Sequence, residues 1–235
     1  MHIARAAGLS VLCIAGATLG GCATSMAVEP PPGFSLAGAW KLDPAASDDP
    51  QKILDRMREE AYKIISRGPT PSYGPPPGAR RGNTQDQVSQ SNDQDYLLAP
   101  GPGGQRPDPL QRSPMAHTIM TAVERGEFLT IRQGPGEFVL DYGSTRRSFT
   151  PGGHSVVSAE GGVGDQTSGW DGRSYTIVVK EQYGSTVTEQ YSLSPDGGQL
   201  VEKLHISSAE LSGVTLMRVY TPTHDSAPRV TPNTD

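Results

Sequence analysis

The stretch STVTEQYSLSPDGGQLVEKLHIS, residues 185–207, gives the strongest indication of the fold. On both sides of its Pro-Asp-Gly-Gly turn, apolar and polar residues alternate with the period of two that is typical of half-buried strands. The turn favours a register with three opposing pairs: Leu193 with Leu200, Tyr191 with Glu202, and Glu189 with Leu204. The stretch therefore predicts an antiparallel hairpin that carries two carboxylates on its apolar face.

Two carboxylates on an apolar face need partners, because an isolated buried charge is costly. Arg218 lies on the apolar face of the last predicted strand, from which its guanidinium can bind one or both of Glu189 and Glu202. Three interpretations stay open: an interior ion network that fixes the strand register, a polar ligand site, and a pair of glycosidase-like carboxylates.

Further strands are predicted on both sides of this hairpin. From Phe128 onward, β-branched and aromatic runs of strand length alternate with Gly-rich turns, and another alternating run covers residues 34–43. Short connections make neighbouring strands antiparallel, and about nine such strands must curl or close to cover their edges. The sequence therefore predicts a mainly β fold: an antiparallel up-and-down meander that closes into a barrel.

One helix is predicted after the first strand, over residues 49–66. Asp48 or Asp49 is a suitable N-cap, and Pro50 suits the first helical position. Gly68 follows the last predicted turn. The helix is thus an insertion between the first strand and the rest of the meander.

Three other segments have compositions that do not favour a packed structure. Residues 67–109 are rich in Gly and Pro, and their few apolar side chains cannot offset the entropy of the chain, so we expect a disordered loop. Residues 222–235 are predicted to form a disordered polar tail. Residues 22–33 contain three consecutive prolines, which predict a stiff tether.

The N-terminus resembles that of a bacterial lipoprotein. Residues 1–21 have the layout of a secretory signal peptide, with an apolar run too short to span a membrane. Leu19-Gly20-Gly21-Cys22 resembles a lipobox, which implies cleavage before Cys22 and acylation of its thiol. Ala23 follows, rather than an aspartate, which implies an outer-membrane anchor and a domain facing the periplasm. More than one acyl chain gives a long-lived anchor.

A second resemblance concerns the β domain. Gly38-Ala39-Trp40 is similar to the G-x-W motif of lipocalins, and Arg218 to the basic residue that packs over this tryptophan at the closed end of their barrel. The segments GAWKLDPAASDDP, SGWDG and MRVY resemble a set of uncharacterised proteobacterial lipoproteins with a lipocalin-like domain. The resemblance implies a lipocalin-like domain over residues 34–221.

Composition and motifs exclude several classes of function. The net charge of −5 and the lack of a basic patch argue against nucleic-acid binding. Cys13 leaves with the predicted signal peptide, so Cys22 is the sole cysteine of the predicted mature chain. Four histidines outside the signal peptide lack the close spacing of metal ligands: His117, His154, His205 and His224. With no catalytic motif found, we expect no enzymatic activity, cofactor or metal.

Two functions of different class remain. In the first, the barrel binds a small, partly apolar ligand, and its interior is lined by six candidate residues: Trp40, Trp170, Glu189, Tyr191, Glu202 and Arg218. In the second, the barrel is a filled scaffold that contacts another envelope protein. A carboxylate-dependent hydrolase is a third, less favoured alternative.

Overall fold

The computed structural model describes residues 26–67, 108–160, 162–182, 184–209 and 211–225. Within these ranges it contains two helices, α1 (Pro50–Ser66) and α3 (Pro114–Glu124). Its ten strands are β1 (Gly38–Leu42), β2 (Phe128–Gly134), β3 (Glu137–Asp141), β4 (Arg146–Phe149), β5 (His154–Ala159), β6 (Gly162–Asp171), β7 (Ser174–Glu181), β8 (Thr186–Leu193), β9 (Leu200–Ser207) and β10 (Val214–Pro222). The predicted signal peptide, the lipobox with Cys22, and most of the predicted loop and tail lie outside the described residues.

The strands form one antiparallel sheet in the order β4-β3-β2-β1-β10-β9-β8-β7-β6-β5. β1 pairs with β2 and also with β10, so the meander returns to its first strand as predicted. β4 and β5 lie at the two ends of this order, and the sheet is a half-barrel that stays open along them. The mainly β fold and its antiparallel meander are confirmed.

The hairpin of residues 185–207 has the predicted register. β8 and β9 pair Leu193 with Leu200, Tyr191 with Glu202 and Glu189 with Leu204. On β10, Arg218 lies opposite Glu202. The two carboxylates therefore lie on the inner face of adjacent strands, as expected from the alternation.

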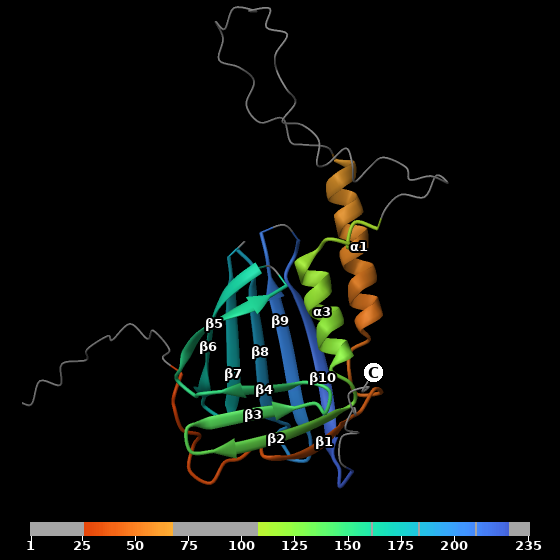
Figure 1. The fold of residues 1–235 in the computed structure, drawn as a ribbon. Helices are drawn as coiled ribbons and strands as arrows, with labels where there is room; N and C mark the ends of the chain where they lie inside the picture. Colours follow the sequence, from red (N-terminus) through yellow and green to blue (C-terminus); the bar gives the residue numbers. More distant parts are fainter. Residues whose placement is uncertain (1–25, 68–107, 161, 183, 210, 226–235) are drawn as a thin grey trace, which may run out of the picture.

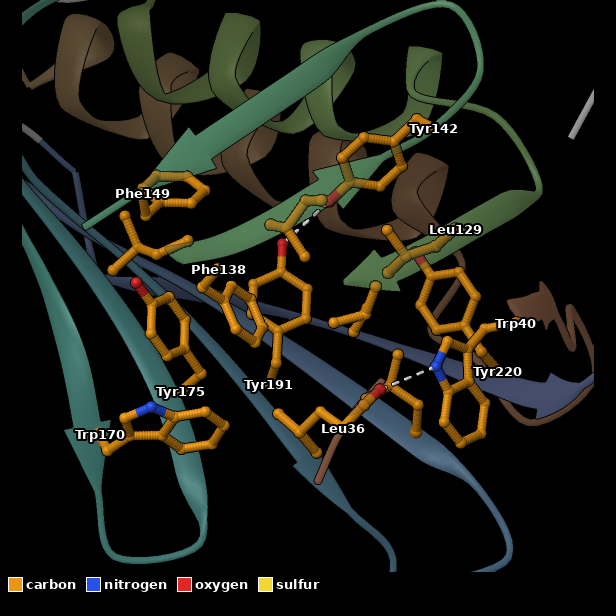
Figure 2. Packing of buried hydrophobic residues seen from close by; sticks show 14 of the residues in the cluster. Leu36, Trp40, Leu129, Phe138, Tyr142, Phe149, Trp170, Tyr175, Tyr191 and Tyr220 are labelled. Atoms are coloured by element: carbon orange, nitrogen blue, oxygen red, sulfur yellow. Dashed lines mark hydrogen bonds between the residues drawn. The ribbon is translucent and has the colours of Figure 1, made fainter. Parts of the chain in front are cut away.

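One end of the half-barrel is filled by large side chains. The half of the sheet with β1–β4 lies across the half with β6–β10 (Figure 1), and residues of both halves meet in between (Figure 2). The ring of Phe138 stacks on Tyr175 with a centroid distance of 3.7 Å, and Trp170 meets Phe138 edge-on at 5.7 Å. We call this cluster the aromatic core: Phe34, Leu36, Trp40, Leu129, Ile131, Phe138, Leu140, Tyr142, Phe149, Trp170, Tyr175, Ile177, Tyr191, Leu200 and Tyr220.

The two helices lie side by side next to β10 (Figure 1). Each begins with a polar N-cap followed by proline, Asp49-Pro50 in α1 and Ser113-Pro114 in α3. Their apolar sides pack on β7–β10 in a second cluster, the helical core: Ile53, Met57, Ala61, Leu110, Met115, Ala116, Ile119, Ala122, Val179, Val187, Leu204, Ile206 and Leu216. Among the described residues, no helix has the length and apolar character needed to span a membrane.

The first described residues are held against the sheet. Ala27 forms a bridge with Trp170, with N–H···O distances of 2.7 and 2.8 Å. A Cβ atom at Gly169 would lie 2.7 Å from the Cβ of Met26, so this close approach requires glycine. The end of the predicted tether thus runs beside the hairpin between β6 and β7.

Two elements were not predicted. α3 adds a second helix after the predicted loop, and β5 adds a tenth strand at one edge of the sheet. The first strand is shorter than the predicted 34–43, because regular pairing is limited to β1. Phe34 and Leu36 precede it but are buried, so the predicted apolar face extends beyond the strand itself.

Candidate functional site

A pocket of about 590 Å³ lies between α3, the open edges of the sheet and the inner face of β6–β8. Ligand sites in proteins generally have volumes of about 300–1,000 Å³. Thr118 and Thr121 of α3, Ser148 of β4, Ser158 of β5 and Gln166 of β6 contribute polar groups. The apolar part of the wall consists of Phe149, Val157, Ala159, Val179 and Val187. The pocket therefore offers a mixed surface to a partly apolar molecule.

Glu189 lies where the pocket meets the interior, and two arginines hold it. Arg125 donates from Nη2 to Oε1 at 3.1 Å and from Nη1 to Oε2 at 3.2 Å. Arg147 donates from Nη1 to Oε2 at 2.6 Å and to Oε1 at 3.0 Å. Because Arg125 is the C-cap of α3 and Arg147 belongs to β4, these pairs connect α3, β4 and β8.

Glu202 continues the network away from the pocket. Its carboxylate lies 3.7 Å from Nη1 of Arg218 and 3.5 Å from Nη1 of Arg125. The hydroxyl of Tyr220 donates to its Oε2 at 2.7 Å. The hydroxyl of Tyr191 lies 3.1 Å from its Oε1. Glu202 is fully buried, so these partners compensate for its lost hydration.

The ion pairs join into one cluster, in which three guanidinium groups surround two carboxylates. We call it the Arg–Glu cluster: Arg125, Arg147, Arg218, Glu189 and Glu202. Tyr191 lies between the carboxylates, since its hydroxyl is also 2.9 Å from Oε2 of Glu189. Tyr142 contacts this hydroxyl at 2.9 Å (Figure 2). The arrangement matches the predicted interior ion network, enlarged by two arginines.

The cluster strongly affects the ionisation of its members. Burial alone would raise the pKa of Glu189, but the charges of Arg125 and Arg147 lower it well below its usual range. Burial, assisted by the charge of Glu202, raises the pKa of Tyr142 to about 12. Glu189 is therefore held as a carboxylate. Glu202 is fully buried and does not line the pocket, so a sugar cannot reach both carboxylates, and the arrangement does not favour carboxylate-dependent hydrolysis.

All six predicted interior residues are buried, but they do not form one ligand site. Trp40, Trp170 and Tyr191 belong to the aromatic core, where they pack against other side chains (Figure 2). Glu202 and Arg218 lie in the Arg–Glu cluster behind the pocket. Of the six, Glu189 alone lines the 590 Å³ pocket, so the predicted ligand lining by aromatic residues is wrong for this pocket.

The stacking of Arg218 on Trp40, implied by the lipocalin resemblance, is also wrong. β1 and β10 pair Trp40 with Pro222, which puts Arg218 four residues, or about 13 Å, further along its strand. The guanidinium lies instead over the ring of Tyr220 at 5.4 Å. The indole nitrogen of Trp40 donates to the carbonyl of Leu36 at 3.2 Å. Arg218 thus meets Glu202 as predicted, but it supports a different aromatic residue.

Sequence reasoning missed two members of the cluster, Arg125 and Arg147. Arg125 follows α3, which was not predicted, and it lies 64 residues from Glu189 in the sequence. Arg147 lies on a predicted strand, but the alternation of that short strand did not single it out. The number of predicted buried charges gave one indication of a further arginine. Arg218 by itself compensates only one of the two inward-facing carboxylates.

The chain matches no protein-family model and no curated protein. Among solved structures, it is similar to the REP1-NXSQ fatty acid transporter, with 14% identity and a TM-score of 0.40 over 81% of this chain and 98% of that chain. Lipid binding protein 8 of Caenorhabditis elegans in its apo form gives 10% identity and a TM-score of 0.41 over 81% and 99%. The zebrafish ileal bile acid-binding protein with cholic acid gives 18% and 0.32 over 46% and 80%. The fold of this chain is given by its own strand pairing.

Proposed function

We propose that this protein is a binding module whose pocket holds a small, partly apolar molecule. The observation that carries the proposal is the 590 Å³ pocket beside α3, with an apolar wall and several polar groups. Val179 and Val187 form part of that wall and are 8% and 6% exposed. Binding of a ligand to such a wall is favourable, because the apolar part of the ligand leaves water.

The elements around the pocket are held in place by ion pairs and hydrogen bonds. Arg125 and Arg147 join α3 and β4 to Glu189 at the base of the pocket. α3 is also fixed to β10, because Arg218 donates to the carbonyls of Ala122 and Gly126 at 2.7 Å each. A pocket bounded by elements held in this way needs little rearrangement on binding, which lowers the cost of association.

Native mass spectrometry of the purified protein tests the proposal by detecting a co-purified small molecule. Ala159 lines the pocket, so Ala159→Trp is expected to fill it and abolish the bound mass. Ala45→Trp is the matched control, because Ala45 is exposed and lies outside the pocket lining. A bound mass that persists in Ala159→Trp would contradict a ligand in this pocket.

We further propose that the chain is a bacterial lipoprotein with a lipocalin-like domain, anchored in the outer membrane and facing the periplasm. The support is the signal-peptide layout of residues 1–21 and the lipobox-like tetrad that ends at Cys22. Acyl chains on Cys22 would provide the membrane contact.

The aromatic core supports a second candidate, a scaffold that acts through protein contacts. Trp40, Trp170 and Tyr191 are 7%, 2% and 0% exposed, so protein side chains occupy the closed end of the half-barrel. Protein side chains, and not a ligand, therefore fill this end. Absence of any bound molecule in native mass spectrometry would favour the scaffold.

A further inference from the structure

Glu181 lines the pocket, and its carboxylate has no partner among the described residues. The residue ends β7 and is 7% exposed, between the apolar side chains of Val179 and Val187 and the open edge of the sheet. Among the described residues, no side chain or backbone group donates a hydrogen bond to its carboxylate and no cation pairs with it. Its backbone N–H and carbonyl are used normally, with Ser185 and Gly184.

The carboxylate oxygens of Glu181 are not fully buried, since Thr176 Oγ1 is the one fully buried side-chain polar atom without a partner among the described residues, so the carboxylate opens onto the pocket. Glu189, by comparison, is 3% exposed and is paired with two arginines. A ligand in the pocket can therefore reach the carboxylate of Glu181 and pair with it. Two further acidic residues, Glu124 and Glu160, line the same pocket and add negative potential there.

The opposite end of the pocket has an opposite character. The Arg–Glu cluster contains three guanidinium groups and two carboxylates, which leaves one positive charge in excess. Arg147 is its most accessible member, with 22% of its side chain exposed, and it lines the pocket. Among the described residues, its hydrogen bonds all leave from Nη1. Nε and Nη2 remain available to an acceptor on a ligand.

The strand register gives the spacing of the two ends. β7 and β8 pair Ile177 with Glu189, and Glu181 lies four residues further along β7, about 13 Å away. Val179 and its partner Val187 lie between them on the same face. The charged groups at the two ends of the pocket are thus separated by an apolar stretch.

We propose that the pocket binds an elongated dipolar molecule, with an ammonium group against Glu181, a carboxylate against Arg147 and an apolar segment over Val179 and Val187. This inference rests on the proposed binding function and specifies its ligand class. A purely apolar molecule would leave Glu181 unpaired, and so would a simple anion bound to Arg147.

Isothermal titration calorimetry with three probes of equal length tests this ligand class: ω-aminodecanoate, decylamine and decanoate. The dipolar probe is expected to bind at least about tenfold more tightly than either singly charged probe, because it alone pairs with both ends. Glu181→Gln should weaken binding of ω-aminodecanoate and decylamine by at least about tenfold and leave decanoate within about twofold. Glu137→Gln, on exposed β3 surface away from the pocket, is the matched control and should change none of the three.

The substitution itself should not unfold the protein, since Glu181 has no partner in the described chain, and a thermal melt of Glu181→Gln checks this. Equal affinity for decanoate and ω-aminodecanoate, unaffected by Glu181→Gln, would overturn the dipolar ligand while the binding function stands. Failure of every probe beside a co-purified mass in native mass spectrometry would do the same. Failure of every probe with no bound mass would overturn both.

Discussion

Replacing Arg218 by methionine removes the residue that ties the sheet to α3. Arg218 is 4% exposed, and it donates to the carbonyls of Ala122 and Gly126 at 2.7 Å each. It also lies 3.7 Å from the carboxylate of Glu202. Methionine has a similar length and no charge, so Arg218→Met removes these interactions with little change in volume.

The expected loss of stability is about 3–5 kcal/mol, the usual cost of removing one partner of a buried ion pair. Each hydrogen bond to a charged group contributes about 1.5–3 kcal/mol on its own. The expected loss is therefore smaller than the sum of the separate contributions of the Arg218 hydrogen bonds and its ion pair. Arg173→Met is the matched control. Arg173 is exposed and lies over the ring of Phe34 at 4.7 Å, a contact that contributes about 0.5–1 kcal/mol at an exposed site.

Urea unfolding of the two purified variants, followed by tryptophan fluorescence, measures the difference. Adding Glu202→Gln to Arg218→Met should restore part of the loss, because glutamine carries no charge yet still accepts the hydrogen bond of Tyr220. Equal unfolding midpoints for Arg218→Met and Arg173→Met would refute the role given to the Arg–Glu cluster. A further loss on adding Glu202→Gln would refute the argument that weaker compensation of Glu202, which keeps Arg125 at 3.5 Å, contributes to the cost.

Three further predictions concern ionisation and anchoring. The folded pKa of Glu189 lies below its ordinary value of 4.5, so its ion pairs contribute stability that is fully present above pH 4.5 and is lost as the pH falls below it. Wild type should therefore lose more stability in acid than Glu189→Gln, as measured by urea unfolding across pH. Burial raises the pKa of Tyr142 and Tyr175 to about 12, so the stability of the fold should decrease as the pH rises from 10 through 12. An absorbance titration should show that these tyrosines ionise together with unfolding. Ionisation near pH 10 without unfolding would contradict their burial. Cys22→Ser should leave an unacylated precursor or soluble protein, and its recovery in acylated form from the outer-membrane fraction would exclude the lipoprotein proposal.

Much of the sheet could be predicted because local patterns determine it. In residues 185–207, strict alternation specifies which side chains face inward, and a short turn fixes the register. β5 was missed because this edge strand is largely exposed, so it shows no alternation of buried and exposed residues. α3 was missed although Ser113-Pro114 repeats the signal of Asp49-Pro50, since the helix has only 11 residues, too few for a clear helical periodicity.

The candidate site was less predictable, because it depends on residues far apart in the sequence. The inward direction of Glu189 follows from its own strand, but its partner Arg147 lies 42 residues away on another strand. The role of Arg125 could be predicted only after α3 itself, because Arg125 is the C-cap of that helix. The size of the pocket likewise depends on how far β4 and β5 stand apart, and no local pattern specifies the separation of two unpaired edges.

The bridge between Ala27 and Trp170 has a consequence for the orientation of the whole domain. It places the chain beside the hairpin of β6 and β7, whereas Glu181, at one end of the pocket, lies at the far end of β7, about 20 Å along the strand from Tyr175. The proposed attachment point Cys22 precedes Ala27 by five residues, which span at most about 18 Å. Such an anchor would hold the aromatic end toward the lipid surface and the Glu181 end of the pocket away from it, so that a ligand entering at that end would come from the aqueous compartment and not from the bilayer.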